Sequence, residues 1–121
     1  MRSLATTMLT MMLLASCGDD GVIYNRPPFS RSEHTFDFRN SEEFISRSAE
    51  FADDHQLEMS VNRFGDGKFS VLLYNRSINL SAVNTVHPST ITIGAISRSD
   101  PTPADQELAR RYFSHMAPLL K

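Results

Sequence analysis

The sequence predicts an α+β domain in which two helices pack on one face of a mostly antiparallel sheet of four or five strands. Several short segments alternate apolar and polar residues, which is the pattern of strands with one buried face. Two longer segments instead repeat their apolar residues at helical spacing, and they lie on either side of the strand-rich middle of the chain. The resulting order β-α-β-β-β-β-α fits a two-layer sandwich.

The first strand and the first helix follow one another closely. The strand is predicted over Thr35–Arg39, where two phenylalanines share one face. Asn40 has the residue type of an N-cap, and with Glu43 three residues later the pattern is close to a capping box. The helix then runs to about Gln56. Its core-facing stripe is predicted to contain Phe44, Ser48, Phe51 and His55.

A β-hairpin is predicted next. Leu57–Phe64 reads as its first strand, and Gly65-Asp66-Gly67 is a strong turn signal, because these residue types accept the backbone conformations of tight turns. The partner strand carries Phe69, Val71 and Leu73 on one face.

The apolar phase shifts by one residue after this hairpin. The next strand has Ile78, Leu80 and Ala82 on its buried face. A straight continuation would turn these side chains to the opposite face, so a turn or a bulge is predicted at Asn75-Arg76. Thr90–Ser97 is predicted as a further strand.

The last helix has clear start and stop signals. Thr102 is its predicted N-cap, Pro103 its first helical position, and Asp105 closes a capping box. Pro118 ends it. Its core-facing row is predicted to contain Leu108, Tyr112 and Met116.

Length and charge limit the function classes. A chain of 121 residues suits one small domain. Its formal net charge of −2, without any basic run, gives no general attraction to nucleic acids. We therefore expect no nucleic-acid partner.

The N-terminus carries a targeting signal. An apolar run of about 12 residues follows Arg2, which is too short for a membrane span of roughly 20 residues but fits a signal-peptide core. It ends in Leu14-Ala15-Ser16-Cys17, a stretch that resembles the lipobox of bacterial lipoprotein precursors. The resemblance implies that residues 1–16 are a signal peptide removed before Cys17, and that Cys17, the only cysteine, carries the lipid, such as palmitate.

This resemblance also predicts an address in the cell envelope. Residues 17–32 contain Pro27-Pro28 and many small polar residues, and are expected to be a flexible tether for a domain over residues 33–121. At about 3.3 Å per residue this tether reaches up to roughly 50 Å. Gly18 follows the cysteine where an aspartate would favour the inner membrane, so the resemblance implies the outer membrane, facing the periplasm, in a Gram-negative host.

No motif indicates catalysis, a metal site or a cofactor. The four histidines (His34, His55, His87 and His115) lack metal-ligand spacing. Gly65-Asp66-Gly67 lacks the acidic positions of a calcium loop and the length of a phosphate loop. We therefore expect no cofactor and no enzymatic activity. A small envelope hydrolase that uses Asp37, Asp66 or His87 is the weakest alternative.

One segment is a candidate interaction surface. Polar residues alternate along the strand that starts near Ser77, and an exposed histidine follows in the loop. If this is an edge strand, it can accept a strand from a partner; otherwise it is an ordinary solvated sheet face. The sequence thus favours a protein-binding accessory module with an envelope protein as partner, and the alternative is a structural lipoprotein without a specific ligand. The surface residues are Ser77, Asn79, Ser81, Asn84 and His87.

Overall fold

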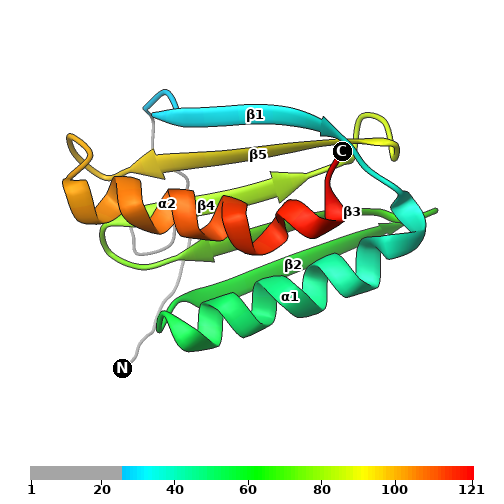
Figure 1. The fold of residues 1–121 in the computed structure, drawn as a ribbon, viewed down its shortest axis with the longest axis horizontal. Coiled ribbons are helices and arrows are strands. Elements are labelled where there is room, and N and C mark those ends of the chain that lie inside the picture. Colours follow the sequence, from blue (N-terminus) through cyan, green and yellow to red (C-terminus); the bar gives the residue numbers. More distant parts are fainter. Residues whose placement is uncertain (1–25) are drawn as a thin grey trace.

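Residues 26–121 are described by a computed structural model of the chain, and they form a five-stranded sheet covered by two helices (Figure 1). The expected signal peptide and Cys17 lie outside these described residues. The elements are β1 (Ser30–Thr35), the 3-10 turn η1 (Phe38–Asn40), α1 (Ser41–Asp54), β2 (Glu58–Gly65), β3 (Lys68–Tyr74), β4 (Ile78–Val83), β5 (Thr90–Ser97), α2 (Pro103–Met116) and the 3-10 turn η2 (Ala117–Leu119).

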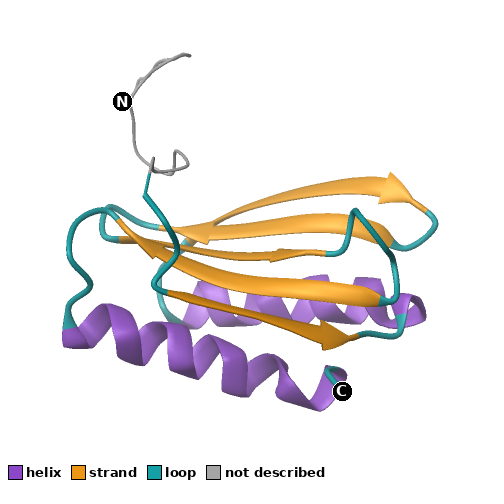
Figure 2. Ribbon diagram, turned by 90° about the horizontal axis from the view of Figure 1, so that it is seen from above, coloured by secondary structure: helices purple, strands orange, loops and turns teal. Residues whose placement is uncertain are grey.

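The strands are arranged β1-β5-β4-β3-β2, and every neighbouring pair is antiparallel. Both helices lie on the same face of this sheet (Figure 2). This confirms the predicted α+β fold class and element order.

The core lies between the sheet and the helices. Along β3 the buried residues are Phe69, Val71 and Leu73, in strict alternation. Phe36, Phe44 and Phe69 form a cluster of three rings whose centroids are 5.4 to 6.0 Å apart. Because each buried phenylalanine in a core of this kind contributes about 3–5 kcal/mol, as judged by truncation to alanine, this cluster is a main source of stability.

The first strand begins earlier than the sequence predicts. β1 is Ser30–Thr35, whereas the expected strand was Thr35–Arg39, and residues 30–32 had been assigned to the tether. The β1 segment contains no large apolar residue, so its alternation carries no hydrophobic signal. It is a strand because it pairs with β5 over its whole length.

The chain turns where the strand had been expected to continue. Phe36 is buried, but Phe38 is 42% exposed and does not share its face. The reason is local, because the side chain of Asp37 accepts a hydrogen bond from the backbone N–H of Arg39 and stabilises the turn η1.

The start of α1 is also held differently. Asn40 occupies the N-cap position but makes no side-chain capping hydrogen bond, so the predicted capping box is wrong. The hydroxyl of Ser41 lies 2.7 Å from the carbonyl oxygen of Phe38 and 2.6 Å from that of Gly67. The helix start is therefore attached to the β2–β3 turn.

The start of α2 agrees with the sequence. Thr102 and Asp105 form the predicted capping box, with Pro103 in the first turn. Asp105 is buried and also accepts hydrogen bonds from the hydroxyls of Ser77 at 2.6 Å and Ser97 at 3.0 Å. Burial raises the pKa of Asp105, but the hydrogen bonds from Ser77, Thr102 and Ser97 outweigh it and lower that pKa below its ordinary value.

The two helices are joined by buried polar contacts as well as apolar ones. The hydroxyls of Ser48 and Tyr112 are 2.8 Å apart and buried. Arg47 donates to the carbonyl oxygen of His115 at 2.7 Å. Burial raises the pKa of Tyr112, so its phenol stays neutral at any physiological pH and keeps its hydrogen bond to Ser48.

Candidate interaction surfaces

β4, which the sequence suggests as an edge strand for partner binding, lies in the interior of the sheet. β4 pairs with β3 on one side and with β5 on the other, so it cannot accept a strand from a partner. The edge-strand hypothesis for this segment is therefore wrong. Polar residues alternate along β4 because one sheet face carries no helix, which is the other interpretation that the sequence left open.

The five residues proposed for that surface do not form one patch. Asn79 and Asn84 are buried, Ser81 is half-buried on the sheet face away from the helices, and His87 is exposed in the β4–β5 loop. Ser77 lies at the other end of β4, where its hydroxyl donates to the carboxylate of Asp105.

Asn84 has a structural role. Its amide oxygen accepts from the backbone N–H of Phe69 at 2.7 Å, and its amide nitrogen donates to the carbonyl oxygens of Gly67 at 3.0 Å and Pro88 at 3.2 Å. The carbonyl oxygen of Gly67 also accepts a hydrogen bond from the hydroxyl of Ser41. Three connections, namely η1, the β2–β3 turn and the β4–β5 loop, are thus tied together at one end of the sheet. We call this end the loop end; it is at the right of Figure 1.

Large apolar side chains are exposed at the loop end. Phe38 is 42% exposed, Phe64 is 58% exposed and Val86 is 97% exposed. Each lies in or next to one of the three tied connections. Sequence reasoning missed all three, although two signals were present: Phe64 is out of phase with the half-buried positions of β2, and Val86 is an apolar residue in a polar loop.

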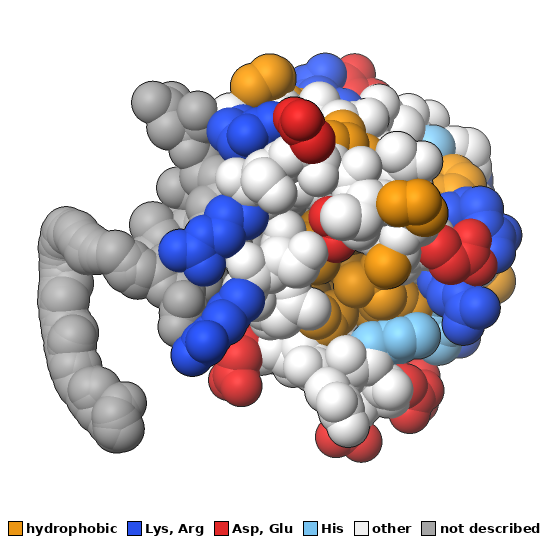
Figure 3. Space-filling view, turned by 90° about the vertical axis from the view of Figure 1, so that its left-hand side faces the viewer, with side chains coloured by type: hydrophobic (Ala, Val, Ile, Leu, Met, Phe, Trp, Pro, Cys, Tyr) orange, Lys and Arg blue, Asp and Glu red, His pale blue; other side chains and the backbone are white. Residues whose placement is uncertain are grey.

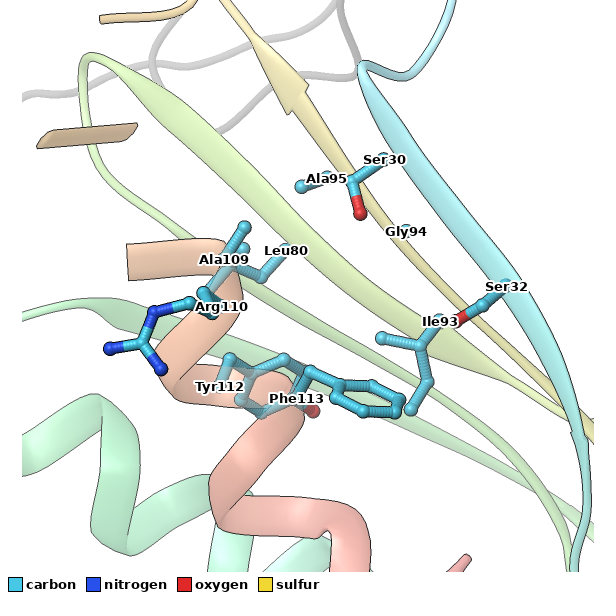
Figure 4. A pocket seen from close by; sticks show the side chains of 10 residues that line it. All are labelled: Ser30, Ser32, Leu80, Ile93, Gly94, Ala95, Ala109, Arg110, Tyr112 and Phe113. Carbon is cyan, nitrogen blue, oxygen red and sulfur yellow. The ribbon is translucent and has the colours of Figure 1, made fainter. Parts of the chain in front are cut away.

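A groove separates α2 from β1 on the helix-bearing face (Figure 4). Its volume is about 320 Å³. Ser30 and Ser32 of β1 lie along one side, and Ala109, Tyr112 and Phe113 of α2 lie along the other. Leu80, Ile93 and Ala95 form its floor, so the lining is mostly apolar with two hydroxyls at the strand.

The outer rim of this groove is aromatic. Phe113 is 38% exposed, and its ring lies 5.2 Å from the imidazole of His34, which belongs to β1. The contact attaches the edge strand to α2. Since β1 itself has no large apolar side chain, this pair supplies packing that the strand lacks.

The opposite end of the sheet, where α2 begins, has mixed charge (Figure 3). Arginine side chains are interspersed there with carboxylates, and an apolar area is visible between them. Arg26 pairs with Asp100 at 3.2 Å. Such exposed pairs contribute little stability, and the mixture of signs gives no single-sign field for a charged ligand.

The structure does not place the three residues named for a hydrolase in one pocket among those that it describes. Asp37 pairs with Arg39, whose hydrogen bonds hold the pKa of that carboxyl at about 2, so it stays ionised and is a poor proton donor. Asp37 and His87 line different pockets. Asp66 sits in the β2–β3 turn with a φ of 57°.

Residues 26–121 show neither a candidate metal site nor a candidate membrane span. These residues contain no group of three histidine, cysteine or acidic side chains that could hold a metal ion. The same part of the chain has no helix long and apolar enough to cross a membrane. Comparison with protein-family models, with curated proteins and with solved structures finds no match to this chain.

Proposed function

We propose that this protein is a lipid-anchored accessory module of the bacterial cell envelope, and that its loop end binds another envelope protein. One observation carries the proposal: three large apolar side chains are exposed in or next to the three connections that Ser41 and Asn84 join at one end of the sheet. Large apolar side chains that are exposed at one end of a small domain are typical of interaction sites.

The chemistry of the loop end fits a protein partner. Phenylalanine offers a large contact area with only two rotatable bonds, so little entropy is lost when it is buried in an interface. The buried amide of Asn84 holds the loops beneath these side chains, which lowers the ordering cost of binding.

The position of the loop end fits an anchored module. Arg26 pairs with Asp100, close to the start of α2 and far from the loop end (Figure 1). A chain that continues to a lipid on Cys17 would therefore leave the described domain at the end opposite the loop end. From Cys17 to Arg26 the chain reaches up to roughly 30 Å when extended, so the domain can approach partners near the membrane surface.

The experiment places a photo-reactive phenylalanine analogue at Val86 or Phe64 in cells that make the full chain. We expect a covalent adduct with one envelope protein of defined mass. The matched control is the same analogue at Asp54, which is exposed at the opposite end of the molecule and should give no adduct. Equal adducts at all three positions, or adducts with phospholipid alone, would contradict protein binding at the loop end.

The anchor is tested separately by palmitate labelling of the wild type and of Cys17→Ser. We expect the label to disappear in the variant. Equal labelling of both would exclude lipidation at Cys17 and would leave the loop-end experiment unaffected.

A further inference from the structure

β1 is an edge strand, and its hydrogen-bonding phase can be assigned. The backbone N–H of Phe36 donates to the carbonyl oxygen of Ser89 at 2.8 Å, in register with the β1–β5 pairs that precede it. In an antiparallel pair, hydrogen-bonded and non-bonded residues alternate. The even-numbered residues of β1 therefore bond to β5, and the backbone groups of Arg31 and Glu33 point to the open edge.

A second contact confirms this phase. The carbonyl oxygen of Thr35, an odd-numbered residue, accepts from the backbone N–H of Lys121 at 3.1 Å, on the side of β1 away from β5. Within residues 26–121 no other strand lies beside β1. The outward N–H and C=O groups of Arg31 and Glu33 are thus available to another extended chain.

The side chains at these two positions carry opposite charges. Arg31 and Glu33 lie on the sheet face away from the helices, 3.6 Å from each other, and each side chain is 59% exposed. Ser32 between them faces the helix side, in register with the buried Ile93. Arg31 and Glu33, whose backbone groups both point to the open edge, are therefore separated by one small residue.

We propose that two copies of this protein pair through β1 in antiparallel orientation, with Ser32 on the two-fold axis, and so form one continuous ten-stranded sheet. In this register Arg31 lies opposite the partner's Glu33, and Glu33 lies opposite the partner's Arg31. Both hydrogen-bonded pairs are then oppositely charged, as directly opposed cross-strand residues prefer. The two Ser32 side chains meet at the axis and are small enough for the strands to approach.

The ends of β1 limit the length of the pairing, and the opposite charges of Arg31 and Glu33 favour this register. Pro27-Pro28 precede the strand and have no N–H to donate, so the ladder stops there. Lys121 already occupies the carbonyl oxygen of Thr35 at the other end. A ladder limited to residues 30–34 is short and predicts a weak, reversible dimer in free solution. The lipid anchor of the proposed function would strengthen it by confining the copies to one surface, although the pairing itself does not depend on that anchor.

The register is tested by disulfide crosslinking of the full chain in isolated membranes. Ser32→Cys should form a disulfide-linked dimer under mild oxidation, because residues opposite each other in a non-hydrogen-bonded pair have Cα atoms about 4.5 Å apart. Ser30→Cys lies opposite the partner's His34 and should crosslink at least tenfold less. Ser60→Cys on the other edge strand, β2, is the second control. Equal crosslinking at positions 30, 32 and 60 would overturn the proposal.

The charge pattern is tested in the Ser32→Cys background. Arg31→Glu places two glutamates opposite two glutamates and should reduce crosslinking at least tenfold; Glu33→Arg should do the same with arginines. Co-expression of these two charge variants should restore a mixed dimer, and the double exchange R31E/E33R should restore the self-paired dimer. Glu43→Arg, an exposed charge change on α1, should have no effect. Failure of both restorations would overturn the proposed pairing.

Crosslinking of the wild-type chain tests lipidation of Cys17 independently of the pairing through β1. Its only cysteine is Cys17, so crosslinking of the wild type shows that this thiol is free and contradicts lipidation. The crosslinking of Ser32→Cys is then measured with Cys17→Ala added, and the pairing is judged by the same ratios. Thermal unfolding of each variant tests whether the domain stays folded, including Ser32→Cys, which removes a hydrogen bond to the imidazole of His34.

Discussion

The two ends of the sheet are each held by one buried polar side chain, but the two side chains differ in chemistry. At the loop end Asn84 bonds three backbone groups, from β3, the β2–β3 turn and the β4–β5 loop. At the opposite end Asp105 receives hydrogen bonds from Ser77, Ser97 and Thr102. The loop end exposes large apolar groups beside the Asp37–Arg39 ion pair, whereas the opposite end exposes mainly mixed charges.

This difference shows how one small domain can present two unlike surfaces on a single core. A neutral amide both donates and accepts, so Asn84 can satisfy two carbonyl groups and one N–H group at once. A carboxylate only accepts, so Asp105 gathers hydroxyl and N–H groups and depends on its ionisation. We therefore expect the hydrogen bonds of Asn84 to be insensitive to pH and those of Asp105 to weaken in acid.

The largest loss in the free energy of unfolding should come from Asn84→Ala. This change leaves the N–H of Phe69 and the carbonyl groups of Gly67 and Pro88 without their partner in a buried region. We expect a loss of about 3 kcal/mol in the free energy of unfolding. Urea unfolding measures it, with the exposed Asn62→Ala on β2 as the matched control. A loss below about 0.5 kcal/mol would show that Asn84 does not hold the loop end together.

The next largest losses of stability should come from alanine at the two glycines of the β2–β3 turn, and the two losses should differ. Gly65 has a φ of 86° and Gly67 a φ of 79°, so alanine is strained at both positions. A Cβ at Gly67 would also come within 2.9 Å of Phe38, whereas nothing lies within 4 Å of one at Gly65. We expect Gly65→Ala to cost about 1 kcal/mol and Gly67→Ala about 2 kcal/mol in urea unfolding. Equal costs would mean that Phe38 moves freely and is not held at the loop end.

Asp105→Asn tests the opposite end, with an expected loss of about 1.5 kcal/mol at neutral pH. The pKa of Asp105 is lowered in the folded protein, so its carboxylate stabilises the fold above the ordinary value of 3.8, and this stabilisation is lost as the pH falls through the folded value. The difference in stability between wild type and variant should therefore shrink as the pH falls below about 4. A difference that stays constant down to pH 2 would contradict an ionised Asp105.

The sequence predicted this fold well where burial is periodic. The hairpin, the phase change before β4 and the capping box of α2 each follow from local chemistry, and the structure has all three. It failed for β1, because a polar strand is specified by pairing with β5, which lies about 60 residues further along the chain. Tertiary pairing of this kind leaves no local pattern.

The candidate surfaces were harder to predict for the same reason. Strand order decides which strand is an edge, and the polar alternation of β4 does not reveal that β3 and β5 flank it. Asn84 was singled out as a surface residue, yet the adjacent connections bury it. The apolar residues of the loop end come from three separate segments, so only the folded chain brings them to one end.

The smallest effect on stability should come from the exposed side chains themselves. Val86→Ser and Phe64→Ser remove apolar groups that are 97% and 58% exposed, so each should change the free energy of unfolding by less than about 0.5 kcal/mol. The same changes should abolish the photo-crosslinked adduct formed from the other position. Asn84→Ala would weaken both fold and binding, whereas these variants separate the two. A large loss of stability in Val86→Ser would mean that this residue serves the fold, and the loop end would then lose its most exposed contact.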